Sequence, residues 1–214
     1  MSTKHDWNAH YAAGELPWDS SEADPNLVEL VRSGVVAKGR VLEIGCGTGT
    51  NALWLASQGF EVLALDLAPL AVERARAKAA AAPRDAAESC SFEVHDFLNG
   101  EPPPGSFQLV FDRGCFHVFD DSKDQLTFAA RVGKLLANGG HWLSLLGSTE
   151  GPAREMGPPR RSAREILQAI EPAVELVQLR AMDFDGPPGA PPPKAWFCLS
   201  RRRDVAAQPS SRFS

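Results

Sequence analysis

One strand-to-helix turn, in the segment VLEIGCGTGT, constrains the fold of this chain more than any other feature. A short apolar run ends at three closely spaced glycines, Gly45, Gly47 and Gly49, and the helical pattern TNALWLASQG begins directly after them. Glycines at such a turn let the backbone turn sharply and let a ligand approach with no Cβ in the way. The segment therefore predicts a buried strand over 39–45, a helix over 50–59 and a large, flat ligand bound at the turn between them.

The rest of the chain alternates short apolar runs with helical patterns. The predicted strands cover 60–66, 91–96, 107–112, 141–147, 174–182 and 194–200, and the predicted helices cover 68–82, 122–137 and 162–170. Repeated alternation of strand and helix predicts an α/β fold with a parallel sheet covered by helices on both faces. The last two strands are joined by a Pro-rich loop with no room for a crossover helix, so we expect this pair to be antiparallel.

Length and composition exclude several classes of protein. A chain of 214 residues with a net charge of −5 fits one domain, and its scattered Lys and Arg form no basic stripe for nucleic acid. No apolar run approaches the roughly 18 residues that span a membrane, and the start of the chain lacks the apolar core of a signal peptide. The cysteines form no C-x-x-C pair, so we predict no metal site. We expect a cytoplasmic protein with no nucleic-acid or membrane partner; its oligomeric state is undefined, and a monomer is compatible with the sequence.

Acidic residues around the glycine turn indicate which ligand it binds. The spacing is G-x-G-x-G, whereas the dinucleotide fingerprint is G-x-G-x-x-G, and Thr50 stands at the third glycine's position. Glu43 precedes the turn, where a carboxylate repels a pyrophosphate but tolerates a cationic aminoacyl sulfonium. Asp66 ends the second strand and suits both ribose hydroxyls, while Asp96 suits an adenine amino group with Phe97 against the ring. The pattern favours S-adenosyl-L-methionine (SAM) over NAD.

These residues resemble the class I SAM-dependent methyltransferases, with EIGCGTG as the loop, Asp66 as the ribose acid and Asp96 as the adenine acid. The resemblance covers about residues 39–147 and implies a Rossmann-like sheet of seven strands in the order 3-2-1-4-5-7-6, the last strand antiparallel. It implies SAM as cofactor and S-adenosyl-L-homocysteine as product. The cofactor residues that it implies are Glu43, Gly45, Cys46, Gly47, Thr48, Gly49, Asp66, Leu67, Asp96, Phe97 and Asp112.

The segment FDRGCFHVF ends the fourth strand and narrows the resemblance to one branch of this class. Ligands bind at the carboxyl ends of strands in open α/β sheets, so we expect Asp112 and Arg113 to face the site. Together with Trp7, Trp18 in ELPWD and a GPP at 157–159, the segment resembles the thiopurine and thiol methyltransferases. Those enzymes carry a similar D-R-G, a Trp-containing amino-terminal cap and a G-P-P. Certain lysine methyltransferases share part of this pattern and remain the alternative.

Three side chains after the fourth strand are candidates for a role in catalysis. Arg113 can orient an acceptor through its fixed bidentate donors, or it can pair with Asp112 or Asp19. His117 is the candidate base near this edge, and the alternative is a loop histidine with a satisfied hydrogen bond. Cys115 is flanked by no basic group except that histidine, so we expect a packed residue rather than a nucleophile.

An amino-terminal cap is expected to cover the cofactor. Its aromatic residues are Trp7, Tyr11 and Trp18. Aromatic faces attract a sulfonium cation, and the alternative is plain packing against the sheet edge. We divide the chain into a cap over 1–38, a SAM-binding core over 39–201 that forms one domain with the cap, and a disordered tail over 202–214.

The chemistry of methyl transfer favours a soft acceptor. The reaction is an in-line displacement that alignment alone accelerates strongly. A thiol with a pKa of about 8.5 is partly ionised near neutral pH, whereas a lysine amine near about 10.4 is costly to deprotonate. We therefore expect transfer to a small-molecule nucleophile, a thiol or another soft atom. Small-molecule O- or N-methylation, protein-lysine methylation and a non-catalytic SAM-binding module remain alternatives, and the glycine spacing disfavours a nicotinamide oxidoreductase.

Overall fold

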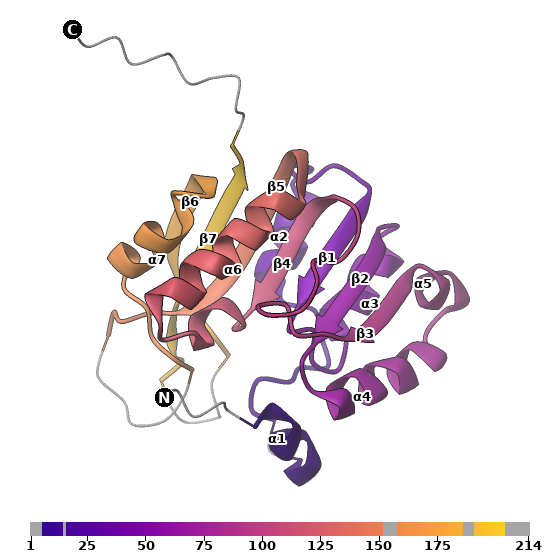
Figure 1. Ribbon diagram of the computed structural model, residues 1–214. Coiled ribbons are helices and arrows are strands. Elements are labelled where there is room, and N and C mark those ends of the chain that lie inside the picture. The colour runs from indigo at the N-terminus through magenta and orange to yellow at the C-terminus, as the bar shows by residue number, and fades with distance from the viewer. Residues whose placement is uncertain (1–5, 15, 152–157, 186–190, 204–214) are drawn as a thin grey trace, which may run out of the picture.

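The computed structural model describes residues 6–14, 16–151, 158–185 and 191–203 and shows an α/β fold around one sheet (Figure 1). The strands are β1 (Arg40–Ile44), β2 (Glu61–Asp66), β3 (Cys90–Val94), β4 (Phe107–Arg113), β5 (Leu136–Gly147), β6 (Val174–Asp183) and β7 (Lys194–Arg202). Seven strands lie in the order β3-β2-β1-β4-β5-β7-β6, and β7 is antiparallel to both of its neighbours. The predicted fold, strand order and antiparallel last strand are confirmed.

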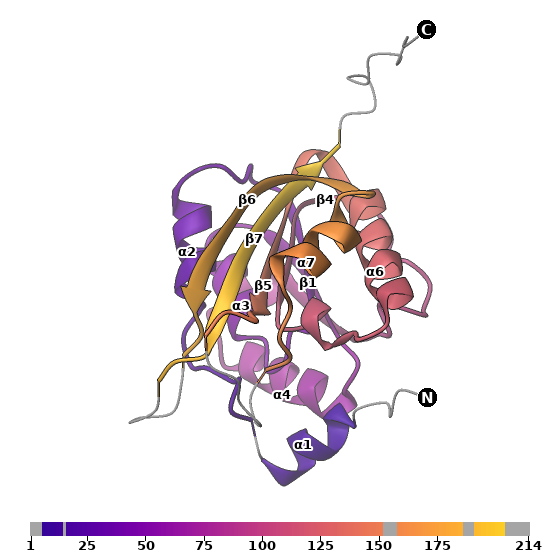
Figure 2. The ribbon, with the colours of Figure 1, turned by 90° about the vertical axis from the view of Figure 1, so that its left-hand side faces the viewer.

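Helices cover both faces of the sheet. They are α1 (Trp7–Ala13), α2 (Pro25–Arg32), α3 (Thr50–Ser57), α4 (Pro69–Ala80), α5 (Arg84–Glu88), α6 (Ser122–Leu135) and α7 (Ala163–Ile170), with a 3-10 turn η1 (Phe116–Val118) after β4. Buried side chains of α2 to α5 pack on one face, and those of α6 and α7 pack on the other (Figure 2). Among the described residues, no helix is long and apolar enough to cross a membrane.

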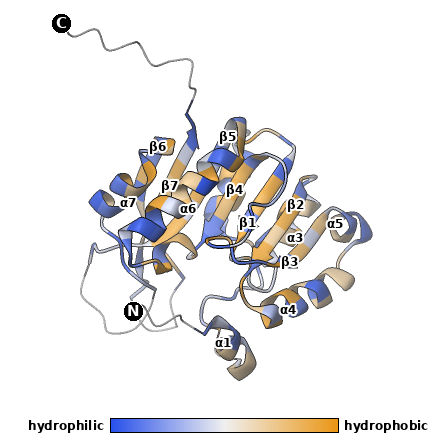
Figure 3. Cartoon of the chain, in the orientation of Figure 1, coloured by the Kyte–Doolittle hydropathy of each residue, from blue (hydrophilic) through white to orange (hydrophobic). Residues whose placement is uncertain are grey.

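The central strands are apolar on both faces because helices bury both. In β1, Val41 belongs to the core under α2 and α3, whereas its neighbour Leu42 belongs to the core under α6. The hydropathy colouring shows this as nearly continuous apolar strands in the middle of the sheet (Figure 3). Each fully buried large side chain, such as Trp142 or Phe128, contributes about 1.5 to 3 kcal/mol to folding. This core holds the carboxyl ends of β1, β2 and β4 in place at one edge.

Several predicted boundaries are wrong for local reasons. β5 begins at Leu136, where we expected the end of a helix, because this residue pairs with Phe107 of β4. The short helix α5 was not predicted. β3 ends at Val94, so Asp96 lies beyond it. Arg202 still belongs to β7, and residues 204–214 of the predicted disordered tail lie outside the described residues.

Buried Arg161 fixes the turn that follows β4. Ser162 and Glu165 form a capping box that starts α7 immediately after this arginine. The guanidinium donates hydrogen bonds to the carbonyl oxygens of His117 at 2.8 Å and Phe119 at 2.9 Å. The amino-terminal end of α7 thus holds the segment after β4 against the sheet.

Candidate active site

The glycine loop between β1 and α3 adopts a conformation that other residues tolerate poorly. Gly45, Gly47 and Gly49 have φ angles of 72°, 56° and 80°, in the left-handed region that favours glycine. A Cβ on Gly49 would lie 2.6 Å from the Phe92 ring, so space as well as φ requires glycine there. The Gly47 amide donates to the Asp66 carboxylate at 2.8 Å and ties the loop to the end of β2.

Glu43 places a buried carboxylate beneath this loop. Its side chain is 2% exposed and hydrogen-bonds to the Asn51 side chain and the Ala52 amide. Burial raises its pKa to about 8, with the negative charge of Asp66 adding to the shift. Its Oε2 has no hydrogen-bond partner among the described residues. A buried acceptor without a partner is costly, which fits a ligand donor such as an ammonium group at this position.

Asp66 at the end of β2 is held by two backbone amides. Gly47 donates to Oδ2 at 2.8 Å, and Ala68 donates to Oδ1 at 2.9 Å. Burial raises the pKa of Asp66, and these two hydrogen bonds act against the rise. The next side chain, Leu67, is 50% exposed. The carboxylate therefore has a fixed orientation and spare lone pairs, with an apolar surface beside it.

A cavity of about 270 Å³ opens beside the glycine loop, and its lining is acidic. The charged lining residues among those described are Asp19, Glu22, Asp24, Glu43, Asp185 and Arg113. Trp18 of the cap, Gly45, Cys46 and Gly47 of the loop, and Asn51 of α3 also line it. Such an excess of carboxylates in a concave site favours a cationic ligand.

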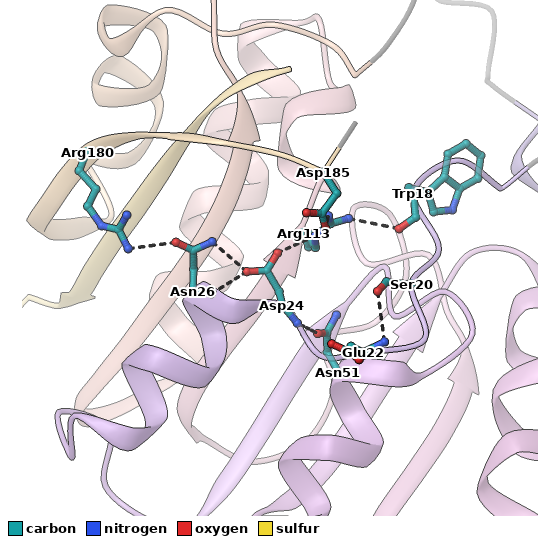
Figure 4. Close-up of polar contacts among 9 residues, drawn as sticks. All are labelled: Trp18, Ser20, Glu22, Asp24, Asn26, Asn51, Arg113, Arg180 and Asp185. Carbon is teal, nitrogen blue, oxygen red and sulfur yellow. Dashed lines mark hydrogen bonds and ion pairs between the residues drawn. The ribbon is translucent and has the colours of Figure 1, made fainter. Parts of the chain in front are cut away.

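Arg113 reaches this cavity from the carboxyl end of β4. Its Nε donates to Asp24 Oδ2 at 2.8 Å, and its Nη1 donates to the Trp18 carbonyl oxygen at 3.2 Å (Figure 4). Its Nη2 lies 3.7 Å from Asp185 Oδ2. The side chain is only 17% exposed, and that of Asp24 is 4% exposed, so their ion pair is largely shielded from water. Arg113 thus joins the cap to the sheet.

Asp24 and Asn51 connect Arg113 to Glu43. Asp24 caps the amino-terminal end of α2 by accepting from the Asn26 amide at 2.9 Å, and its own amide donates to Asn51 Oδ1 at 2.8 Å (Figure 4). Because Asn51 also hydrogen-bonds to Glu43, one chain of contacts runs from β4 to the glycine loop. The Asp24-Pro25 pair is a helix-start signal that sequence reasoning missed.

The expectation that Asp112 faces the site together with Arg113 is wrong. Asp112 is 0% exposed and accepts hydrogen bonds from Trp142 Nε1 and the Phe116 amide, each at 2.9 Å. Burial raises its pKa to about 6. Neighbouring side chains of a strand point to opposite faces, so only one of the two reaches the cavity. The expected alternative pairing of Arg113 with Asp112 or Asp19 is also wrong, since its partners are Asp24 and Asp185.

His117 is buried next to β5, and Cys115 is half-buried against the glycine loop. Nδ1 of His117 accepts a hydrogen bond from the Gly147 amide at 2.8 Å, so this nitrogen is already engaged. The ring is 4% exposed and is not among the residues that line the cavity, which fits the alternative of a loop histidine with a satisfied hydrogen bond. Burial raises the pKa of Cys115, and a Cβ on Gly45 would lie 3.0 Å from its Cβ. Cys115 thus packs against the glycine loop, and His117 packs against Gly114.

Asp96 and Phe97 are not among the residues that line the cavity. The Asp96 carboxylate accepts from the Leu98 and Asn99 amides at 3.1 and 3.0 Å, in a turn beyond β3. Phe97 is 5% exposed, and its ring centroid lies 4.8 Å from that of Phe128 in the core under α6. The expected contact of Phe97 with an adenine ring stays a prediction, and this side chain packs toward the core.

The cap packs its aromatic residues against the glycine loop and α4. Trp18 donates from Nε1 to Tyr11 Oη at 3.5 Å, and its ring meets that of Trp7 edge-on at 5.7 Å. Tyr11 is 4% exposed, and a Cβ on Gly47 would lie 3.1 Å from its hydroxyl. In Figure 1, α1 lies beside α4, and the Arg74 guanidinium bonds the Tyr11 carbonyl oxygen at 2.6 Å. Of these aromatic residues, Trp18 lines the cavity.

Polar contacts that were not predicted fasten the cap to the loop. Thr48 Oγ1 donates to Asp19 Oδ1 at 2.8 Å, and Thr50 Oγ1 donates to the Ser20 carbonyl oxygen at 2.8 Å. Lys78 of α4 donates to both threonine hydroxyls, at 2.6 and 2.7 Å. These partners are far apart in the sequence, so no local pattern could have found them. Of the predicted GPP, Gly157 lies outside the described residues.

The sheet order, the glycine loop and the buried Glu43 beneath it define the chain as a class I SAM-dependent methyltransferase. It belongs to the thiopurine S-methyltransferase family, whose model matches residues 2–190. It is 36% identical over 153 residues to a probable thiol methyltransferase 2 of Arabidopsis thaliana, covering 72% of this chain and 65% of that protein. It is 29% identical over 182 residues to thiocyanate methyltransferase 1 of Brassica oleracea, covering 85% of this chain and 76% of that protein.

Solved structures share the fold. A structure from work on the conversion of a disulfide bond into a thioacetal group during echinomycin biosynthesis has a TM-score of 0.72 and 27% identity, covering 87% of this chain and 84% of that chain. The glycopeptide N-methyltransferase MtfA in complex with SAM has a TM-score of 0.68 and 18% identity, covering 86% of this chain and 95% of that chain. The predicted resemblance to the thiopurine and thiol branch is confirmed by the family match.

Proposed function

We propose that this chain transfers the methyl group of SAM to the sulfur of a small-molecule thiol in the cavity beside the glycine loop. The observation that carries the proposal is Glu43 Oε2, a buried oxygen without a partner among the described residues, next to an acidic cavity. A cationic aminoacyl sulfonium supplies both the donor and the positive charge that this arrangement lacks. A pyrophosphate cofactor would meet carboxylates there instead.

Residues of β1 and β2 would hold SAM. Glu43 would bind the ammonium group, since it ends in an unpaired acceptor at the base of the loop. Asp66 would accept hydrogen bonds from the ribose hydroxyls, since two backbone amides already fix its orientation. Leu67, half exposed beside it, would offer apolar contact to the adenine ring.

The protein's contribution to the reaction is alignment and exclusion of water. When bound, SAM supplies a methyl carbon that the thiol sulfur attacks, with the old bond leaving its electron pair on the sulfonium sulfur and the thiol proton passing to water. Arg113, which lines the cavity from β4, would orient the acceptor. Trp18 and its neighbours in the cap would exclude water from the reacting atoms. No side-chain base is required, because a thiol with a pKa of about 8.5 ionises readily.

The family supports sulfur as the acceptor atom. The chain belongs to the thiopurine S-methyltransferase family, and the relatives described above are named for thiols and thiocyanate. The raised pKa of the half-buried Cys115 and the burial of His117 also fit a reaction that uses neither a nucleophilic enzyme group nor an enzyme base. The acceptor would then be a soft nucleophile that needs no activation.

Two measurements test this proposal. Thermal unfolding with SAM, S-adenosyl-L-homocysteine and NAD in parallel should show stabilisation by the first two alone, by about 2.7 kcal/mol at about 100 times the dissociation constant. Radiolabelled SAM should then give methyl transfer to thiols and not to amines, hydroxyls or lysine peptides. Transfer to an amine or hydroxyl with thiols unreacted would overturn the choice of acceptor. Tight SAM binding with no turnover would identify a non-catalytic module.

A further inference from the structure

The guanidinium of Arg113 is already shared between two carboxylates. Asp24 accepts from Nε at 2.8 Å in a largely buried pair, and Asp185 lies 3.7 Å from Nη2. The Trp18 carbonyl oxygen accepts from Nη1 at 3.2 Å. Contacts therefore occupy all three nitrogens, and one positive charge faces two negative ones (Figure 4). The edge formed by Nε and Nη2 already faces carboxylates, so it is not open to the parallel two-bond pair by which a free guanidinium binds an anion.

Asp185 is held at this position by its neighbour. Phe184 is 8% exposed, its ring centroid lies 5.1 Å from the Arg113 guanidinium carbon, and its amide donates to the Pro193 carbonyl oxygen at 2.8 Å. The Asp185 side chain is 84% exposed, yet it lines the cavity. Phe184 thus holds the solvent-exposed carboxylate of Asp185 at the rim of the cavity. There it faces Arg113 Nη2, a nitrogen that Asp24 does not contact.

The other charged residues of the cavity also disfavour an anionic acceptor. Asp19, Glu22 and Asp24 line it together with Asp185, and Arg113 is the one basic residue among the described lining residues. SAM supplies positive charge close to Glu43, but the acidic rim beyond it stays uncompensated. An acceptor with a carboxylate of its own would have to displace Asp185 or lie among like charges.

We propose, on the basis of the function proposed above, that the acceptor is an uncharged thiol and that Asp185 excludes anionic thiols by occupying their place at Arg113. Asp185 is then a specificity-determining residue, and Asp24 is the permanent partner that holds the guanidinium. Neutral acceptors with a hydrogen-bond acceptor near sulfur would still reach the remaining guanidinium hydrogens. Under this assignment, the cavity selects acceptors by their charge as well as by their shape.

Two matched pairs of thiols test the proposal in the full-length chain. Mercaptopropionamide and mercaptopropionate have nearly the same shape and differ in charge, and mercaptobenzamide and mercaptobenzoate form an aromatic pair. The ratio of kcat/KM for the amide to that for the carboxylate is measured at about pH 7.5 with saturating SAM. We expect the unmodified protein to favour the amide by roughly tenfold.

The variant Asp185→Asn removes the rim charge and keeps the side-chain shape. It should lower the amide-to-carboxylate ratio by roughly fivefold or more, and comparison with the unmodified protein cancels the intrinsic reactivity of each thiol. The matched control is Asp183→Asn, which removes a charge that pairs with Lys194 Nζ at 2.9 Å on the neighbouring strand. That control should leave the ratio unchanged.

The outcomes separate the two proposals. Equal use of amide and carboxylate by the unmodified protein, or an unchanged ratio in Asp185→Asn, would overturn the role of Asp185 while thiol methylation stands. If Asp185→Asn and Asp183→Asn shifted the amide-to-carboxylate ratio equally, the effect would come from the net charge of the protein. That result would also overturn the role of Asp185. Failure to methylate any thiol, with transfer to another acceptor atom, would overturn the proposed function and this inference with it.

Discussion

Glu43 should make SAM binding depend on pH, and its burial fixes the direction. Burial raises the pKa of Glu43 from its ordinary value of 4.5 to about 8, so the carboxyl is protonated in the ligand-free protein at about pH 6.5. A bound ammonium group favours the ionised form and lowers that pKa. Binding between about pH 5 and pH 8 therefore releases a proton, and SAM affinity rises with pH by up to about tenfold per pH unit.

Calorimetry in buffers of different ionisation enthalpy measures this release directly. We expect close to one proton per SAM at about pH 6.5. Glu43→Gln should abolish the release and flatten the pH dependence. Glu22→Gln is the matched control, because this glutamate lines the same cavity but is exposed. An affinity independent of pH over this range, or a proton release unchanged in Glu43→Gln, would refute the reasoning.

The same pKa shift acts on the stability of the ligand-free protein. Because the pKa of Glu43 is raised on folding, its protonated form contributes stability that is fully present below about pH 4.5 and is lost as the pH rises through about 8. The shift corresponds to no more than about 5 kcal/mol. Urea unfolding should therefore show Glu43→Gln gaining stability over the unmodified protein between about pH 5 and pH 9. If both proteins lost the same stability as the pH rises, the loss would come from groups other than Glu43.

Three further substitutions probe the site. Arg113→Lys should lower kcat/KM for the acceptor by roughly 10- to 100-fold, while its SAM affinity stays within about twofold of that of the unmodified protein. If steady-state and binding assays showed a loss of SAM affinity alone, this prediction would be wrong. Asp24→Ala should cost about 3 to 5 kcal/mol in urea unfolding, since it leaves Arg113 buried without its main partner; a loss under about 1 kcal/mol would show a weak pair. Gly49→Ala should cost more than about 1 kcal/mol through its φ of 80° and the Phe92 ring, and an unchanged melting temperature would argue against that contact.

The sheet and the glycine loop were predictable because their signals are local. Alternating apolar runs and helical patterns locate the strands, and three glycines at the end of one of them locate the loop. The start of β5 was missed because Leu136 reads equally well as the end of a helix, and only its pairing with Phe107 makes it a strand. Tertiary contacts decided that boundary.

The site was predicted less completely, because it depends on side-chain direction and on distant partners. Alternation along β4 sends Arg113 to the cavity and its neighbour Asp112 into the core, which a list of acidic residues cannot reveal. Arg113 meets Asp24 across 89 positions of sequence, and it also meets Asp185, which follows β6. No spacing rule connects such residues.

The acidic rim also bears on which acceptor the chemistry favours. The thiol gives up its proton to water and attacks as the thiolate, whose negative charge is neutralised as its bond to the methyl carbon forms. Carboxylates such as Asp19 and Asp185 repel the thiolate, and this repulsion falls as the methyl group is transferred. A carboxylate on the acceptor keeps its charge throughout, so its repulsion by the rim is not relieved in the transition state. The charge of this cavity therefore favours an acceptor whose thiol is its only ionisable group, in the chemical step as well as in binding.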